Sequence, residues 1–303
     1  MAFLTTENIA LSNRKIYYQI KYYKNLFFDL LKIRITLMVA VTTIVGYILF
    51  SSYIDFKTGI VTFAVFVLAC GASVLNEYHE RHTDMLMERT KSRPIPSGKI
   101  SPLSALLISI LLISTGLIIL TSINIKLFFL GSFTLFWYNF VYTPLKYKFA
   151  LAIIPGSLVG ALPPIIGWVA AGGNIFSINI LLLSLFLFIW QIPHFWLLLL
   201  VYDKDYKKGG VPTITNIFSE SQIAKYTFGL IVFLILFSFT LINKSISLNV
   251  FNIFSFILLG VSLLVKTSKI LFNSNKMIYK KTFLYINVYI LFILLVIVFD
   301  KTI

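Results

Sequence analysis

Apolar runs of about 20 residues recur along the chain, and they constrain its fold more than any other feature. A helix of that length crosses the ~30 Å hydrocarbon core of a bilayer, and its backbone hydrogen bonds are satisfied within the segment. The composition agrees, because 58% of the 303 residues are hydrophobic and only 12% are charged, against about 25% in soluble domains. The weak alternating pattern of an outer-membrane barrel is absent from the sequence. The sequence therefore predicts an all-α membrane protein.

These runs predict nine transmembrane spans in a single domain, residues 34–303, which follows a polar and basic N-terminal segment, residues 1–33. The expected spans are 34–53, 58–76, 101–121, 127–145, 150–171, 177–200, 226–243, 249–266 and 283–299. Pro155, Pro163 and Pro164 are expected to kink the fifth span. Membrane helices tolerate such kinks when neighbouring groups satisfy the freed backbone.

The basic residues predict the orientation of the spans. Of the 26 Lys and Arg residues, 22 fall on one side of the nine spans and 4 on the other. The basic side is normally cytoplasmic, so we expect the N-terminus inside and the C-terminus outside. The same clustering in short loops argues against nucleic acid as a partner, although the net charge is +15. Residues 1–33 show neither a signal nor a transit pattern, which favours a bacterial inner membrane.

Three oxygen-bearing side chains recur where the second span leaves the membrane. Asn76, Glu80 and Asp84 are spaced i, i+4, i+8. On a continuing helix this spacing drifts by only ~80°, so the three side chains share one face. Such ligands suit Mg²⁺, which binds one or two carboxylates together with substrate phosphates. We interpret them as catalytic and metal-binding groups; the alternative is a solvated, salt-bridged helix end.

Two arginines follow in the same segment, four residues apart. Arg89 and Arg93 are predicted catalytic groups that make charge-assisted contacts with phosphate. Pro94 and Pro96 are expected to end the helix. Metal ligands followed by arginines favour a site for a diphosphate.

A second acidic segment follows the sixth span. Asp203 and Asp205 are expected in a loop at its cytoplasmic end, where they bind a second Mg²⁺ or complete the first site, and contact the substrate. Taken alone, this segment is better explained as a turn of mixed charge. Two acidic segments on the same membrane face, however, favour metal and diphosphate binding.

Further polar side chains near span ends are candidate substrate-binding groups. Lys146 adds a cation at the end of the fourth span, four residues after Tyr142. Its alternative role is orientation of the span by positive charge. His194 lies within the sixth span, where polar residues are functional candidates by default. A hydrogen-bonded interior histidine is nevertheless the commoner case.

Taken together, these motifs resemble the UbiA-type intramembrane prenyltransferases, and among them the branch that farnesylates haem. That superfamily carries two acidic motifs in cytoplasmic loops after the second and sixth spans. The matching segments are 87–94 (Met-Glu-Arg-Thr-Lys-Ser-Arg-Pro), 142–146, 163–168, 193–196 (Pro-His-Phe-Trp) and 205–212, with Lys32 and Arg34 entering the first span. The resemblance covers about residues 26–215.

The resemblance implies a UbiA-type bundle and a reaction in which farnesyl diphosphate and haem B give haem O and diphosphate, with Mg²⁺ as cofactor. It implies that Lys32, Arg34 and Lys146 bind substrate, that Tyr142 faces a developing carbocation, and that His194 serves the acceptor. The expected partners are the lipid bilayer and a downstream haem-processing enzyme.

The sequence departs from that branch in its first motif, and other functions remain open. Glu80 stands where the branch usually has Asp, and His82 where it often has an acidic residue. The main alternative is a related prenyltransferase acting on a quinone precursor or chlorophyllide. A secondary transporter would place charged groups near the bilayer midplane, whereas these clusters lie at the ends of spans.

Overall fold

The structure is a computed structural model that describes residues 6–245, 250–273 and 275–302. Over these residues the chain is helical and contains no strand, as predicted. Seven stretches are long and apolar enough to cross a membrane. They are α2 (Ile33–Ser51), α3 (Phe56–Leu86), α4 (Pro102–Ile123), the broken segment Ile153–Ala171, α10 (Ile178–Lys208), α11 (Glu220–Ser245) and α13 (Lys276–Thr302). They correspond to seven of the nine predicted spans.

The two remaining predicted spans are also helical where the structure describes them. The fourth consists of α5 (Ile125–Phe136), the π-helical turn η1 (Trp137–Tyr142) and α6 (Thr143–Leu145), joined end to end. The eighth corresponds to α12 (Val250–Thr267), which is followed by the short η3 (Ser268–Leu271). Neither is among the seven stretches that meet the length and hydropathy limits. Nine spans therefore stay a prediction.

Prolines divide the fifth predicted span, as expected. It is built from α7 (Ile153–Gly156), α8 (Leu158–Ala161) and α9 (Pro163–Ala171). Pro163 and Pro164 occupy the first turn of α9, where the missing N–H groups cost no helical hydrogen bond.

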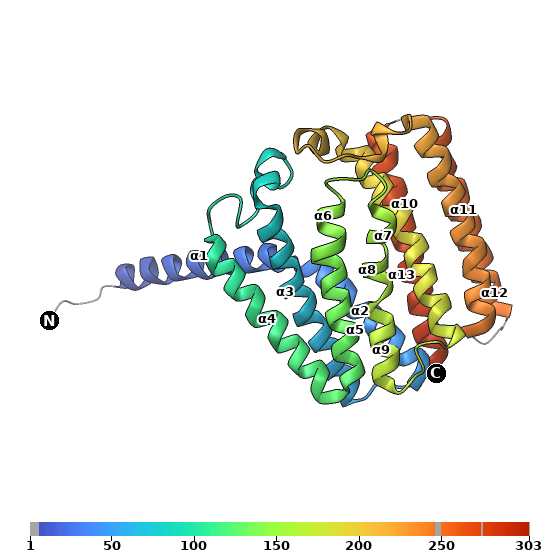
Figure 1. The fold of residues 1–303 in the computed structure, drawn as a ribbon, viewed down its shortest axis with the longest axis horizontal. Helices are drawn as coiled ribbons and strands as arrows, with labels where there is room; N and C mark the ends of the chain where they lie inside the picture. The colour runs from blue at the N-terminus through green and yellow to red at the C-terminus, as the bar shows by residue number, and fades with distance from the viewer. Residues whose placement is uncertain (1–5, 246–249, 274, 303) are drawn as a thin grey trace.

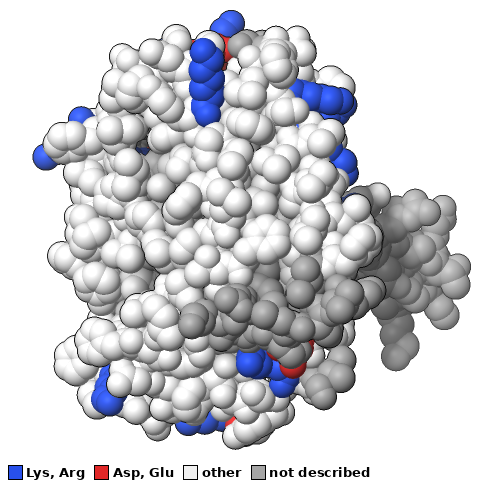
Figure 2. Space-filling view, turned by 90° about the vertical axis from the view of Figure 1, so that its right-hand side faces the viewer, with Lys and Arg blue, Asp and Glu red and all other residues white. Residues whose placement is uncertain are grey.

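The helices stand side by side in one bundle (Figure 1). The connections from α3 to α4, from α6 to α7 and from α10 to α11 lie at the same end of it, and the C-terminus lies at the opposite end. Figure 2 shows a wide band of uncharged side chains on one side of the bundle, with Lys and Arg toward the two ends. Such a band is expected for a surface that faces lipid.

Two helix ends differ from the sequence-based expectation. α3 ends at Leu86, not at the prolines eight and ten residues later, because Met87 adopts an extended backbone. The hydroxyl of Thr90 then donates to the carbonyl of Asp84, which caps the helix from the loop. α10 continues to Lys208 past a non-helical Tyr202. The second acidic segment therefore lies on a helix, and the predicted loop was wrong.

Glycines allow α2 and α9 to pack in backbone contact. A Cβ atom built on Gly46 of α2 would lie 2.0 Å from the carbonyl oxygen of Pro164. A Cβ atom on Gly167 of α9 would lie 2.0 Å from the carbonyl oxygen of Thr43. Small residues that permit such close approach are typical of helix contacts in membranes. This contact fixes α2 against α9.

Replacing Gly46 by alanine should therefore destabilise the fold. The added methyl group meets backbone atoms that cannot move aside, and overpacking of this kind typically costs about 1–3 kcal/mol. We expect Gly46→Ala to lower the melting temperature of the detergent-solubilised protein, measured by size-exclusion chromatography after heating. Gly59→Ala is the matched control, because no atom lies within 4 Å of its added Cβ. Equal melting temperatures for the two variants would contradict the close contact.

Candidate active site

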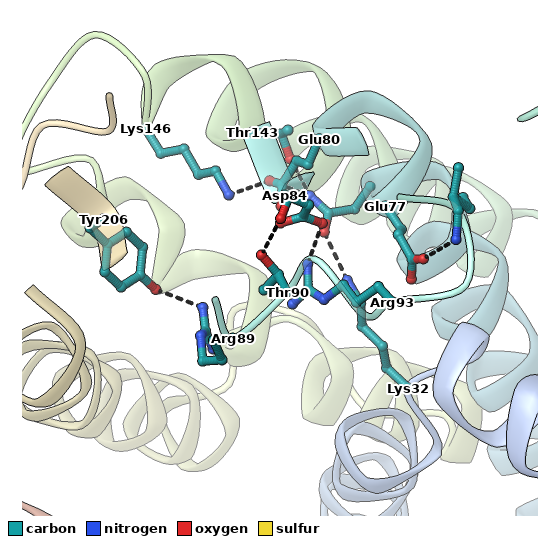
Figure 3. A network of polar contacts seen from close by, with 12 residues as sticks. Lys32, Glu77, Glu80, Asp84, Arg89, Thr90, Arg93, Thr143, Lys146 and Tyr206 are labelled. Atoms are coloured by element: carbon teal, nitrogen blue, oxygen red, sulfur yellow. Dashed lines mark hydrogen bonds and ion pairs between the residues drawn. The ribbon is translucent and has the colours of Figure 1, made fainter. Parts of the chain in front are cut away.

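Three buried side chains project from one face of the last turns of α3. Asn76, Glu80 and Asp84 are 4%, 4% and 0% exposed. Because α3 stays helical to Leu86, the i, i+4, i+8 spacing does align them. The C-terminal end of α3 lies at the end of the bundle that holds the connections from α3 to α4, from α6 to α7 and from α10 to α11 (Figure 1). Glu80 and Asp84 lie close together there (Figure 3).

Each carboxylate of this face pairs with a cation from another element (Figure 3). Lys146, which follows α6, forms an ion pair and hydrogen bond with Glu80 Oε1. Arg93, from the loop after α3, places Nη1 2.6 Å from Asp84 Oδ2. Burial would lower the pKa of both cations, but the adjacent carboxylates raise each pKa above its usual value. Both cations are therefore charged at neutral pH.

Lys32 adds a third cation, from the junction of α1 (Thr6–Leu30) and α2. Its Nζ donates to Asn76 Oδ1 at 3.0 Å, and its backbone is left-handed, with φ of 48°. Burial, and then the nearby Arg93, lower the pKa of Lys32 to about 8. The amide of Asn76 donates in turn to Glu80 Oε1 at 2.8 Å and to Thr143 Oγ1 at 3.1 Å. The side chain of Asn76 thus connects α2, α3 and α6.

Sequence reasoning missed two residues that hold this cluster together. Glu77 is fully buried, and its Oε1 accepts from the backbone N–H of Ile95 at 3.0 Å, which fixes the loop that carries Arg93. Thr143 receives the Asn76 amide and itself donates to the carbonyl of Tyr138 at 2.8 Å. Glu77 belongs to the same acidic run, so its charge was visible in the sequence. Thr143 lies 67 residues from Asn76 in the sequence, and no neighbouring residue indicates that the two side chains are in contact.

Two carboxylate oxygens of the cluster, Glu77 Oε2 and Asp84 Oδ1, are buried without a hydrogen-bond partner. Asp84 Oδ1 has none, although Oδ2 of the same carboxylate pairs with Arg93. A buried carboxylate oxygen left unpaired is costly, so it marks a place where a cation or a donor fits. With the oxygens of Glu80 and Asn76 on the same helix face, this donor set suits Mg²⁺, which needs only one or two carboxylates beside substrate phosphate.

The second acidic segment contacts the same loop but does not join this cluster. Asp205 Oδ2 accepts from the backbone N–H of Arg89 at 3.0 Å. The guanidinium of Arg89 donates to the hydroxyl of Tyr206 at 3.2 Å and lies over the ring of Tyr202 at 5.1 Å. Asp203 pairs with Lys207 at 2.7 Å and accepts from the hydroxyl of a threonine in η2 (Ile214–Asn216).

The predicted residues therefore fall into two groups. Among the described residues, no three His, Cys, Asp or Glu side chains are grouped so as to hold one metal ion. A metal shared by both acidic segments stays a prediction. Arg93 lies with Asp84, whereas Arg89 lies with the second segment, at α10 (Figure 3).

A small cavity of about 60 Å³ lies between these two groups. Its lining includes Tyr142 and Lys146, Phe195 and Tyr206 of α10, and Pro212. Two predicted groups, Tyr142 of η1 and Lys146, therefore share this cavity with side chains of α10. Arg34, in contrast, is exposed on α2, with no hydrogen bond or ion pair to any described residue.

His194 lies apart from both groups, in the middle of α10. Its Nδ1 is 2.9 Å from Asn287 Oδ1 on α13. The Asn287 amide nitrogen donates to the carbonyl of Phe283 at 2.7 Å, which leaves Oδ1 to accept. We therefore assign the proton to Nδ1, so that Nε2 carries a free lone pair. The ring packs against Trp190 and Phe283, with centroids at 4.8 and 4.5 Å.

Several known proteins are similar to this chain. A protein from Geobacter sulfurreducens named protoheme IX farnesyltransferase is 40% identical over 182 residues, 60% of this chain and 67% of the relative. A protein of the same name from Christiangramia forsetii is 38% identical over 185 residues, 61% of each chain. These two alignments span about two thirds or less of the relatives' length. A third, from Flavobacterium psychrophilum, is 35% identical over 288 residues, 91% of this chain and 94% of the relative.

Solved structures share the fold. A digeranylgeranylglyceryl phosphate synthase has a TM-score of 0.73 at 19% identity, covering 92% of this chain and 98% of that one. A UbiA homologue from Archaeoglobus fulgidus, bound to GPP and Mg²⁺, has a TM-score of 0.63 at 15% identity, covering 90% and 99%. At these identities the likeness extends to the fold alone.

The match to the protein family itself covers most of the chain. The model of the UbiA prenyltransferase family matches residues 39–294, which confirms the resemblance drawn from the motifs. The chain is an enzyme and an integral membrane protein, and it belongs to the UbiA prenyltransferase family.

Proposed function

We propose that this enzyme transfers the farnesyl group of farnesyl diphosphate to a vinyl group of haem B, giving haem O. The relatives named protoheme IX farnesyltransferase, 35–40% identical, support the substrate pair. The observation that carries the chemistry is the buried cluster of paired carboxylates and cations at one end of the bundle.

The charge of this cluster explains why a metal must accompany the diphosphate. Three carboxylates and three cations share the site, so their charges balance. The carboxylates are Glu77, Glu80 and Asp84, and the cations are Lys32, Arg93 and Lys146. A diphosphate entering alone would leave buried negative charge without compensation, which is strongly unfavourable. Divalent Mg²⁺ would offset most of that charge.

Asn76, Glu80 and Asp84 would hold Mg²⁺, with Asp203 and Asp205 serving a second ion or the far side of the diphosphate. When bound, Mg²⁺ neutralises charge on the leaving diphosphate. The UbiA homologue solved with GPP and Mg²⁺ supports this pairing of metal and prenyl diphosphate.

The cations of the site then act on the diphosphate. Arg93, Lys146 and Lys32 would donate to the diphosphate oxygens, while the carboxylates would hold the metal. Donors already in place stabilise the charge that develops as the allylic C–O bond breaks. The farnesyl cation is attacked by the electron-rich vinyl carbon, and water adds to the resulting cation with loss of a proton. The ring of Tyr142, beside Lys146 in the small cavity, faces the prenyl cation.

His194 serves the acceptor in this proposal. Its Nε2 lone pair is fixed by Asn287 through the proton on Nδ1. It lies in an aromatic setting within the bundle, where an apolar macrocycle entering from lipid would dock. His194 lies apart from the Glu80–Asp84 cluster, as expected for a residue that binds the acceptor and not the diphosphate.

The membrane arrangement completes the proposal. The domain 34–303 spans a bacterial inner membrane nine times, with the N-terminus and the diphosphate site in the cytoplasm and the C-terminus outside. The 22-to-4 distribution of basic residues supports this orientation. Arg34, exposed on α2, attracts the diphosphate to the cytoplasmic surface, and a downstream haem-processing enzyme takes up the product.

The direct test is a product assay. Purified protein with Mg²⁺, haem B and farnesyl diphosphate should form a haem whose mass has increased by one farnesyl group and one hydroxyl group. A quinone precursor and chlorophyllide, offered in place of haem B, should give no prenylated product. Prenylation of either acceptor but not of haem would replace the proposal with the related activity. Solute transport without any transferase activity would remove it.

Asp84→Asn should reduce turnover by at least about 100-fold, the usual cost of losing one charge-stabilising group. The substitution keeps the size of the side chain but removes the charge on which metal and Arg93 depend. Glu88→Gln is the matched control, because Glu88 is an exposed acid that pairs with Lys91 at the surface. The measurement is the initial rate of each variant in the product assay, compared with that of the wild-type enzyme. Near-normal turnover by Asp84→Asn would refute the assignment of Asp84 as a metal ligand.

Arg93→Lys should raise the KM for farnesyl diphosphate by about 10-fold, because lysine retains charge but loses the fork of donors that matches a phosphate. Arg89→Lys should change this KM little. The contact of Arg89 with Asp205 is made by its backbone N–H, which the substitution leaves in place. Steady-state kinetics at saturating haem B separate the two arginines. A larger effect at position 89 than at position 93 would reverse their assignment.

His194→Ala should raise the KM for haem B and leave that for farnesyl diphosphate unchanged. Asn287→Leu should show a weaker defect of the same kind, because His194 remains but its tautomer is no longer fixed. Saturation curves for each substrate in turn provide the measurement. A defect confined to farnesyl diphosphate would show that His194 does not serve the acceptor.

A further inference from the structure

Among residues 17–30, whose side chains the structure describes, the N-terminal helix α1 is buried against the bundle at its C-terminal end. Leu30 is fully buried and packs with Val74 of α3, Ile95 of the loop and Ala105 of α4. Leu26, one turn earlier, is 8% exposed. From there α1 runs sideways, across the direction of the long helices (Figure 1). Its anchored end therefore sets the level at which it leaves the bundle.

The height of that level along α3 is close to the thickness of a hydrocarbon core. At 1.5 Å per residue, Val74 stands roughly 27 Å along α3 from its first residue, Phe56. The hydrocarbon core of a bilayer is about 30 Å thick. If the start of α3 lies at the opposite edge of that core, α1 leaves the bundle where acyl chains give way to headgroups.

The described surface of α1 exposes many aromatic side chains, and one of its faces carries no charge at three successive positions. Ile20, Tyr23 and Phe27 are spaced i, i+3, i+7, so they share one face, and they are 62%, 56% and 46% exposed. Lys21 and Asn25 project from the opposite face and are also exposed, together with Tyr18, Tyr22 and Phe28. Tyrosine and lysine side chains are amphipathic, so a long helix that exposes them beside an aliphatic and aromatic face matches a helix that lies in the membrane interface.

The lysine side chains of α1 indicate which lipid headgroups it would contact. Lys21 and Lys24 are exposed, and neither has an ion-pair partner among the described residues. Basic side chains near a bilayer surface attract anionic headgroups by about 1 kcal/mol each. We propose that α1 lies flat in the headgroup layer on the active-site side, with its Ile20 face toward the acyl chains, and that its lysines bind anionic phospholipid.

This placement has a consequence for the site. α1 joins α2 through Lys32, whose left-handed backbone turns the chain from the membrane plane into the bundle. Lys32 is also the cation that binds Asn76. A helix held by lipid therefore holds one of the three cations of the cluster in place.

Spin labels placed singly along α1 test the proposal in the full-length protein. Labels are attached to Ile20→Cys, Tyr23→Cys and Phe27→Cys, with Lys21→Cys and Asn25→Cys as matched controls on the other face. The single native cysteine, Cys70, is buried and is replaced by alanine in the background. Each protein is reconstituted into vesicles of phosphatidylcholine with one quarter phosphatidylglycerol, and into phosphatidylcholine alone. Collision rates with oxygen and with a water-soluble nickel chelate are measured by electron paramagnetic resonance.

We expect oxygen to reach the three apolar positions severalfold more readily than nickel does, and the reverse at the two controls. The difference between oxygen and nickel access should be smaller in vesicles of phosphatidylcholine alone. It should also be smaller in anionic vesicles when the protein labelled at Phe27→Cys carries both Lys21→Gln and Lys24→Gln. Equal nickel access at all five positions in anionic vesicles would overturn the proposal. Protection from both reagents with spin–spin broadening would also overturn it, because it would show a second copy of the chain on this face.

Discussion

The pairing of buried carboxylates with cations from separate elements is the interaction on which the rest of the site depends. Glu80 with Lys146 and Asp84 with Arg93 join α3 to the end of α6 and to the loop after α3. Removing one partner of a buried pair leaves a charge without compensation, at a cost of about 3–5 kcal/mol. The pairs therefore hold elements together while no substrate is bound. In the proposed function, the same cations would bind the diphosphate while the carboxylates would hold a metal ion.

Helices that extend beyond the apolar span place this chemistry at the membrane surface. α3 has 31 residues and α10 also has 31, well beyond the ~20 needed to cross the hydrocarbon core. Their extensions carry Asp84 and Asp205 on rigid helical backbone, and the loop that bears Arg89 and Arg93 links them. Charged groups thus stay at the aqueous edge, while the apolar substrates can reach the site from lipid.

Local periodicity made much of this predictable from the sequence, and long-range contacts account for the rest. The apolar runs indicated the helices, and the spacing of Asn76 and Asp84 placed both on one face. The end of α3 is an exception with a local cause, because the extended backbone of Met87 and the contact of Thr90 with Asp84 stop the helix before the prolines. Contacts such as that of Asn287 with His194, 93 positions apart, arise from helix packing that no nearby residue indicates.

Equilibrium binding of a non-reactive farnesyl diphosphate analogue, with and without Mg²⁺, tests the charge-balance account most directly. Titration calorimetry on the detergent-solubilised enzyme would give both dissociation constants. The account predicts that chelating the metal weakens binding by at least about 100-fold, because the buried diphosphate would lack compensation worth several kcal/mol. Equal affinity in the presence and absence of Mg²⁺ would contradict it, since the three cations alone would then suffice to hold the diphosphate.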